Sequence, residues 1–275
     1  MERFWINGEP GRLIDITDRG MAYGDGLFET IAIRHSAPRF LDLHLDRLHA
    51  GAARLGLPAP ERSWLQAQLA VAAASIDEGV MKLLLTRGSG PRGYAPPAHP
   101  RPTVAWSTET RRMQRWTQIR VRWCETIAGR NPATAGLKTL CRLEQVLARA
   151  EWQDESIAEG LMCDEQGLLT GGTASNVFIV AGGCLQTPEV TSSGISGIMR
   201  RVVMEQAREC GIKVSEVPLT RQQLLEAQEV FVSNALTGIR PVCQLGERSW
   251  SPGPVTCSLA VRLVQLGVGE CAGNC

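Results

Sequence analysis

Lysine is rare in this chain, so few residues can carry out chemistry that needs a primary amine. Of the 29 basic side chains, only Lys82, Lys138 and Lys213 are lysines. Lys82 lies in an apolar run typical of a strand, and Lys213 lies on the polar side of an alternating segment, so both are expected to reach into solvent. Lys138 follows a glycine turn and precedes an amphipathic helix, so its amine is expected at a strand-to-helix junction beside a cleft. A lysine amine forms Schiff bases, which suits carbonyl substrates and pyridoxal phosphate.

The segment around Lys138, residues 136–146, reads Gly-Leu-Lys-Thr-Leu-Cys-Arg-Leu-Glu-Gln-Val. It resembles the cofactor-lysine segment of the fold-type IV pyridoxal phosphate enzymes, which include the branched-chain aminotransferases, and most closely that of the 4-amino-4-deoxychorismate lyases. Four further segments resemble this family in the same order along nearly the whole chain, and five ordered motifs are more specific than any single glycine-rich loop. These four segments are residues 23–29, 87–94, 194–200 and 234–242.

The resemblance implies a two-domain α+β fold with mixed sheets and packed helices. We expect a smaller N-terminal domain at 1–108, a connection at 109–117 and a larger domain at 118–275 that holds Lys138. The family also implies a homodimer whose interface helps to build the site. Hydrophobic periodicity predicts strands at 3–7, 12–16, 27–34, 80–86, 103–107, 118–124, 159–164, 175–180 and 229–233, and helices at 41–55, 61–76, 143–152, 197–209 and 254–266.

The family resemblance assigns roles to individual residues, with Lys138 holding the cofactor and moving a proton. The cofactor phosphate is assigned to Arg47, Ile198, Met199 and Thr237, and the substrate carboxylates to Arg87, Arg92 and Tyr94. Each assignment has a structural alternative: a solvated helix arginine for Arg47, an exposed hairpin tip for residues 87–94, and an ordinary helix capped by Ser196 for Ile198 and Met199. Arg142, four residues after Lys138, is expected to approach the cofactor or substrate, or to lie on a helix surface.

One position departs from the family pattern. Where the family carries a glutamate that binds the pyridine nitrogen, this chain has Gly171. Without that carboxylate the cofactor is a poorer electron sink, a loss that affects a lyase less than a transaminase, because the lyase reaction ends in an aromatic ring. A neighbour such as Glu165, or a water molecule, is the alternative partner.

Composition excludes several other functions. A net charge of +1 and the lack of a basic patch with interleaved aromatic residues argue against nucleic acid. No apolar stretch is long enough to span a membrane, so a cytoplasmic protein is expected. The spacing of Cys271 and Cys275 lacks partner ligands, and no metal is predicted.

The predicted function is therefore that of an aminodeoxychorismate lyase, which converts 4-amino-4-deoxychorismate to p-aminobenzoate and pyruvate for folate synthesis. One alternative is an aminotransferase of the same fold acting on D-amino acids or branched-chain amino acids. The other is a pyridoxal phosphate-binding relative that has lost turnover.

Overall fold

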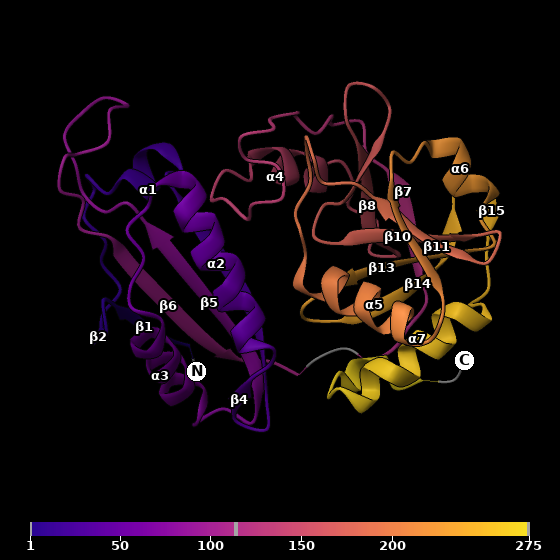
Figure 1. Cartoon of the computed structure of the whole chain (residues 1–275), viewed down its shortest axis with the longest axis horizontal. Coiled ribbons are helices and arrows are strands. Elements are labelled where there is room, and N and C mark those ends of the chain that lie inside the picture. The colour runs from indigo at the N-terminus through magenta and orange to yellow at the C-terminus, as the bar shows by residue number, and fades with distance from the viewer. Residues whose placement is uncertain (1, 113–114, 274–275) are drawn as a thin grey trace. The chain divides into compact units, whose positions relative to one another are not determined.

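The computed structural model describes residues 2–112 and 115–273, which form two compact units (Figure 1). Unit 1 comprises Met1–Met113 together with Leu137–Cys141, and unit 2 comprises Gln114–Gly136 and Arg142–Cys275. The Lys138 segment thus belongs by its contacts to unit 1, although the residues on both sides of it belong to unit 2. Residues 113 and 114 of the predicted connection, and Cys275 of the cysteine pair, lie outside the described residues.

Unit 1 is an antiparallel sheet with two long helices on one face (Figure 1). Alternate residues of β3, including Ile31 and Ile33, are fully buried with Leu45 and Leu48 of α2 and Leu65 of α3, as expected when one face of a sheet is covered. The strand order is β2-β1-β6-β5-β3-β4. The strands are β1 (Arg3–Ile6), β2 (Glu9–Pro10), β3 (Gly26–Arg34), β4 (Ala37–Pro38), β5 (Glu78–Thr86) and β6 (Thr103–Thr110), and the helices are α1 (Arg19–Tyr23), α2 (Leu41–Leu55) and α3 (Arg62–Ala73).

Unit 2 contains the mixed sheet, in the order β12-β11-β10-β13-β14-β7-β8-β9, with β15 beside β14. Its helices include α5 and α7, which pack on β13, and the stacked rings of Phe178 and Phe231 lie in its core with centroids 4.9 Å apart. The strands are β7 (Ile119–Trp123), β8 (Ile157–Cys163), β9 (Leu169–Gly172), β10 (Asn176–Ala181), β11 (Cys184–Pro188), β12 (Lys213–Val217), β13 (Glu229–Asn234), β14 (Gly238–Leu245) and β15 (Arg248–Ser249); the helices are α4 (Leu143–Ala150), α5 (Ile198–Glu209), α6 (Arg221–Glu226) and α7 (Pro254–Gln265), followed by a 3-10 turn at Gly269–Cys271.

The predicted strand at 12–16 is wrong. Residues 12–16 form no strand, and Leu13 and Ile16 are 90% and 77% exposed. Their apolar alternation resembles that of a strand, but they have no partner strand in the described part of the chain. Residues 19–23, for which no element was predicted, form the short helix α1, with Asp18 accepting a hydrogen bond from the Gly20 N–H at its start.

Candidate active site

Lys138 lies on an extended segment that is hydrogen-bonded to the beginning of β3. The Phe28 N–H donates to the Lys138 carbonyl at 2.9 Å, and the Leu140 N–H donates to the Gly26 carbonyl at 3.0 Å. The half-buried Lys138 side chain places its Nζ 4.2 Å from the centroid of the Phe28 ring. This segment is not helical, because α4 begins only at Leu143. Backbone bonds on both sides of Lys138 thus fix the main chain from which its amine extends.

The other two lysines are exposed, as predicted. Lys82, however, projects from β5 on the same side of the sheet as Phe28, and its Nζ lies 5.7 Å from the centroid of that ring. Two amines therefore flank one aromatic ring. Sequence periodicity assigned Lys82 to solvent and missed this proximity; the signal that would have found it is the pairing of β3 with β5, which places Thr30 opposite Lys82.

Arg47 is held by a buried carboxylate. Its Nε donates to Oε1 of Glu29 at 2.7 Å and its Nη2 donates to Oε2, while Nδ1 of His44 lies 2.6 Å from Oε2. Burial alone would raise the pKa of Glu29, but the hydrogen bonds from His44 and Arg47 outweigh it and lower that pKa. Burial lowers the pKa of His44 as well. The bidentate contact fixes the direction of the Arg47 guanidinium.

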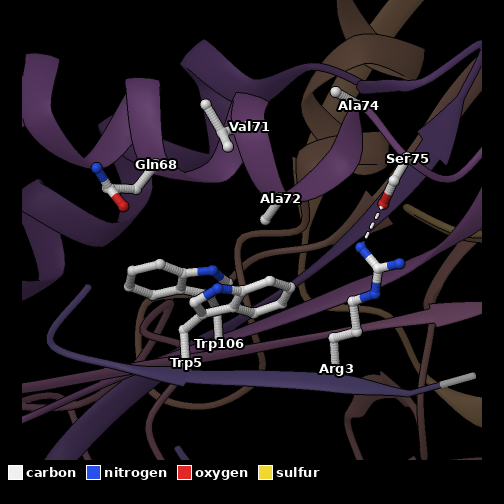
Figure 2. A pocket seen from close by; sticks show the side chains of 8 residues that line it. All are labelled: Arg3, Trp5, Gln68, Val71, Ala72, Ala74, Ser75 and Trp106. Carbon is white, nitrogen blue, oxygen red and sulfur yellow. Dashed lines mark hydrogen bonds between the residues drawn. The ribbon is translucent and has the colours of Figure 1, made fainter. Parts of the chain in front are cut away.

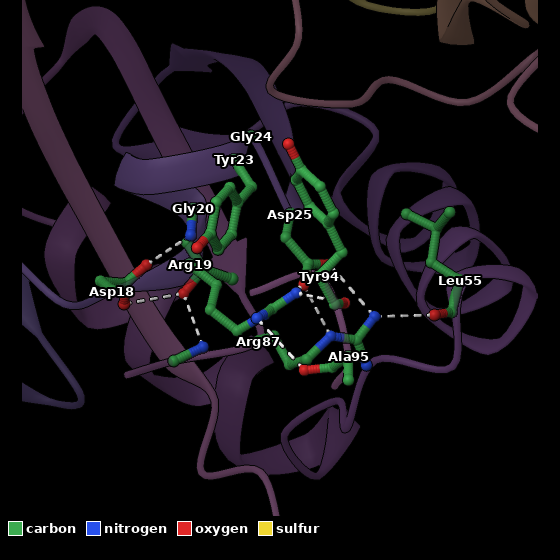
Figure 3. A network of polar contacts seen from close by, with 12 residues as sticks. Asp18, Arg19, Gly20, Tyr23, Gly24, Asp25, Leu55, Arg87, Tyr94 and Ala95 are labelled. Atoms are coloured by element: carbon green, nitrogen blue, oxygen red, sulfur yellow. Dashed lines mark hydrogen bonds and ion pairs between the residues drawn. The ribbon is translucent and has the colours of Figure 1, made fainter. Parts of the chain in front are cut away.

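Arg87 and Tyr94, two of the predicted substrate residues, differ sharply in exposure. Arg87 is 7% exposed and donates to both oxygens of Asp25 and to the carbonyls of Leu55 and Gly56 at the end of α2. The structure thus gives four of its five N–H groups an acceptor within the protein. Tyr94 is 85% exposed, and Arg92 is exposed on the same loop. Figure 3 shows the polar contacts around Asp25, with Arg19, Arg87 and Tyr94.

The beginning of α5 offers backbone donors in unit 2. The predicted Ser196 cap is wrong: Gly197 occupies the N-cap position, and no side chain caps the helix. Among the described residues, no acceptor is recorded for the N–H groups of Ile198 and Met199. A Cβ on Gly197 would collide with Oδ1 of Asn176, so only glycine allows the Asn176 side chain to pack this close to the start of the helix. An uncapped helix N-terminus of this kind favours an anion.

Thr237 lies in a turn at the end of β13. Both its N–H and its hydroxyl donate to Oδ1 of Asn234, at 2.9 and 3.0 Å. The hydroxyl of the neighbouring Ser233, 1% exposed, has no partner among the described residues, and Ser233 pairs in register with Asn176. Such an unpaired buried hydroxyl is uncommon in folded proteins. Sequence reasoning did not identify Ser233.

Gly171 has a backbone conformation that L-residues rarely adopt. Its φ is +147°, and a Cβ there would lie 2.8 Å from the Ser175 carbonyl oxygen. Glu165 is exposed in the turn after β8. The carboxylate that borders this loop belongs instead to Glu159, which is 7% exposed and accepts hydrogen bonds from the loop residues Thr173, Ala174 and Ser175.

Arg142 is the N-cap residue of α4 and belongs to unit 2, whereas Lys138 belongs to unit 1. The four residues from Lys138 to Arg142 do not make a helical turn, because α4 begins only at Leu143. The apolar stripe of α4 is exposed: Leu143, Val146 and Leu147 are 69%, 61% and 53% exposed, while Ala148 is fully buried.

A cavity of about 330 Å³ lies elsewhere in unit 1 (Figure 2). It lies between α3 and the indole rings of Trp5 and Trp106, and the bond from Arg3 to Ser75 borders it. None of the predicted site residues lines it, so it is separate from the Lys138 site.

In the described ranges, no group of three or more His, Cys, Asp or Glu residues is arranged to hold a metal. No helix there is both long and apolar enough to cross a membrane.

Comparison with known proteins finds the amino-transferase class IV family, whose model matches residues 26–245. An aminodeoxychorismate lyase of Vibrio harveyi is 34% identical over 247 residues, which cover 87% of this chain and 90% of that protein. The crystal structure of 4-amino-4-deoxychorismate lyase from Pseudomonas aeruginosa is 40% identical, with a TM-score of 0.91 and coverage of 95% of this chain and 98% of that one. A branched-chain amino acid aminotransferase of Escherichia coli has a TM-score of 0.87 at 26% identity, covering 98% and 95%. The predicted fold-type IV, α+β class is confirmed.

Proposed function

Because the chain belongs to the amino-transferase class IV family, we propose that it is an aminodeoxychorismate lyase that forms p-aminobenzoate and pyruvate. The observation that carries this proposal is the setting of Lys138. Its amine stands 4.2 Å from the Phe28 ring on a segment fixed by backbone bonds, and the similarity to the Pseudomonas aeruginosa lyase extends over 95% of the chain.

The donors present fit pyridoxal phosphate, which carries an aldehyde and a phosphate group. Lys138 supplies the amine for the aldehyde. The uncapped N–H groups of Ile198 and Met199, the Thr237 turn and the guanidinium of Arg47 are the donors proposed for the phosphate.

When bound, pyridoxal phosphate supplies an electron sink for the electrons of a broken C–H bond. Lys138 is the residue proposed to take the proton from C4 of the substrate. The face of Phe28 stabilises a protonated amine by a cation–π contact, so the lysine can hold this proton. Loss of the C4 proton and of the enolpyruvyl group leaves an aromatic ring, and the released fragment becomes pyruvate.

The two substrate carboxylates require cations and donors. Arg92 and Tyr94 are exposed on the 87–95 loop and supply one set. Lys82, whose amine lies over the Phe28 ring that also borders Lys138, supplies another within unit 1. Arg87 contributes at most one further N–H, because its other donors are bound to Asp25 and α2. Arg142, half-buried at the start of α4, remains a proposed substrate contact.

We propose a homodimer as the active form. The exposed stripe of Leu143, Val146 and Leu147 supports this, because an apolar helix face is stabilised when a second copy covers it. The cytoplasm is the proposed location, since buried cysteines such as Cys124 and Cys163 are free thiols.

The test is to supply aminodeoxychorismate to the protein loaded with pyridoxal phosphate and to measure p-aminobenzoate by fluorescence and pyruvate with lactate dehydrogenase. We expect both products in equal amounts, and loss of both in Lys138→Ala. Lys213→Ala is the matched control, because Lys213 is an exposed lysine of unit 2, and it should keep wild-type rates. Full activity in Lys138→Ala would refute the assignment.

An aminotransferase is the second candidate, supported by the likeness to the Escherichia coli branched-chain enzyme. Gly171 argues against it, because no carboxylate at this position keeps the ring nitrogen protonated. Amino transfer from D-alanine or L-leucine to 2-oxoglutarate, without p-aminobenzoate formation, would favour this candidate. Cofactor binding without either product would identify a relative without turnover.

A further inference from the structure

We propose that Arg19 is a positioning residue, which fixes the 90–95 loop so that Arg92 and Tyr94 meet the substrate carboxylates. This inference rests on the proposed lyase function and deepens it. Arg19 lies in α1, far from the loop in sequence, and its side chain is 4% exposed. Arg19 is not among the site residues predicted from the sequence.

The Arg19 side chain binds the main chain of the loop and not the side chains of the loop. Its Nη1 donates to the carbonyl of Gly93 at 2.9 Å and, in a longer contact, to that of Ala95 at 3.4 Å. Its Nη2 donates to the carbonyl of Tyr94 at 3.0 Å. Three consecutive carbonyls thus converge on one guanidinium. Hydrogen bonds from a charged donor are stronger than those between neutral groups, so this contact holds the backbone of the loop in one conformation.

An aromatic pair completes the attachment. The Arg19 guanidinium lies 4.9 Å from the centroid of the Tyr23 ring, and the Tyr23 hydroxyl accepts a hydrogen bond from the Gly93 N–H at 3.1 Å. The Tyr94 ring packs edge-on against Tyr23, with centroids 5.5 Å apart. The loop is therefore fixed both by its backbone and by the contact of the Tyr94 ring with Tyr23, while Tyr94 itself stays 85% exposed and available to a ligand.

Asp25 links this loop to the element that carries Lys138. Its carboxylate accepts from Nε of Arg19 at 2.9 Å and from Nε of Arg87 at 2.7 Å (Figure 3). Burial alone would raise the pKa of Asp25, but the two arginines outweigh this and lower it, so the carboxylate stays charged at neutral pH. The next residue, Gly26, accepts the backbone bond of the Lys138 segment. The loop and the Lys138 segment are thus both attached at the beginning of β3, the loop through Asp25 and the Lys138 segment through Gly26.

This arrangement assigns Arg19 to substrate recognition rather than to proton transfer. Loosening the loop leaves the Lys138 segment in place, because that segment is bonded to Gly26 and Phe28 and not to Arg19. We therefore expect a change in the KM for aminodeoxychorismate with little change in kcat. A residue that acted only on overall stability would not produce that split.

The experiment compares Arg19→Gln and Arg19→Lys with Arg62→Gln. Arg62 is the matched control: it is also an ion-paired arginine of unit 1, but its partners Asp42 and Asp46 are exposed, and it does not contact the 90–95 loop. The first readout is trypsin cleavage of the Arg92–Gly93 bond in the holoenzyme, followed by mass spectrometry. We expect cleavage of Arg19→Gln about tenfold faster than wild type, the effect of losing on the order of one charge-assisted hydrogen bond.

The second readout is steady-state kinetics. We expect Arg19→Gln to raise KM about tenfold with kcat within about twofold, again the value of roughly one such bond. Arg19→Lys should be intermediate in both assays, because a lysine reaches Asp25 but does not bind three carbonyls at once. If Arg19→Gln does not fold, Tyr23→Phe serves in its place, since it removes only the acceptor for the Gly93 N–H and should accelerate the same cleavage.

Wild-type cleavage and KM in Arg19→Gln would overturn the proposal, as would an equal effect in Arg62→Gln. A fall in kcat with unchanged KM would also overturn it, since it would place Arg19 in the chemistry. If the wild-type enzyme makes no p-aminobenzoate, the proposed function fails, and the proteolysis result still decides whether Arg19 fixes the loop.

Discussion

Replacing Glu29 with glutamine tests the buried charge cluster of unit 1. The Glu29 side chain is 1% exposed and contacts His44 at 2.6 Å and the Arg47 guanidinium through both oxygens. Glutamine keeps the shape but removes the charge, which leaves Arg47, 14% exposed, without this partner. Breaking a buried pair in this way costs about 3 kcal/mol or more. At roughly 2–4 °C per kcal/mol, Tm should fall by about 10 °C.

The assay is thermal unfolding followed by circular dichroism, with Asp46→Asn as the control. Asp46 contacts Arg62 at 2.8 Å, a similar distance, but the two side chains are 51% and 37% exposed. An exposed pair of this kind is worth less than about 1 kcal/mol, so Asp46→Asn should lower Tm by at most about 3 °C. Equal Tm values for Glu29→Gln and Asp46→Asn would refute the reasoning that burial, and not distance, decides the cost.

Three further predictions concern pH, Gly171 and α4. The pKa values of Glu29 and His44 are both lowered in the folded state, so the unfolded chain binds more protons than the folded one as pH falls. The contribution of the two groups to stability should therefore be complete above pH 6.5, the ordinary pKa of histidine, and decrease below it. Tm measured as a function of pH tests this. Gly171→Glu should lower Tm through about 1–3 kcal/mol of backbone strain and should not tighten pyridoxal phosphate binding in an absorbance titration, because its φ is +147° and the Ser175 carbonyl oxygen lies 2.8 Å from the new Cβ. Val146→Glu should give monomers in sedimentation velocity without loss of helix content, since Val146 is 61% exposed on the stripe proposed as the dimer contact; unchanged dimers would place the contact elsewhere.

The long helices and strands were predictable from the sequence, because their hydrophobic periodicity extends over several helical turns or several alternating residue pairs. The α2 stripe and the strand at 27–34 are found close to their predicted places, as α2 (Leu41–Leu55) and β3 (Gly26–Arg34). The strand predicted at 12–16 failed because alternation shows only that two faces differ, not that a partner strand exists. Ser196 failed as a cap for a similar reason: the residue type suits the position, but the helix begins one residue later, after Gly197.

The site was predictable where a residue type is rare and not where a contact is long-range. Three lysines left few candidates for an amine, and Lys138 differed from the others in its surroundings. The partners of Arg87 and Arg19 are up to 76 residues away in sequence, and nothing local to either arginine indicates Asp25 or the 93–95 carbonyls. The proximity of Lys82 to Phe28 likewise depends on strand register, which a single sequence does not fix.

Chemical trapping of the cofactor on its lysine tests the central claim most directly. Sodium borohydride reduces the bond between pyridoxal phosphate and its amine, and peptide mass spectrometry then identifies the labelled residue. We predict a label on Lys138 and none on Lys82 or Lys213. A label on Lys82, whose amine borders the same Phe28 ring, would contradict the account, and so would a protein that carries no label at all.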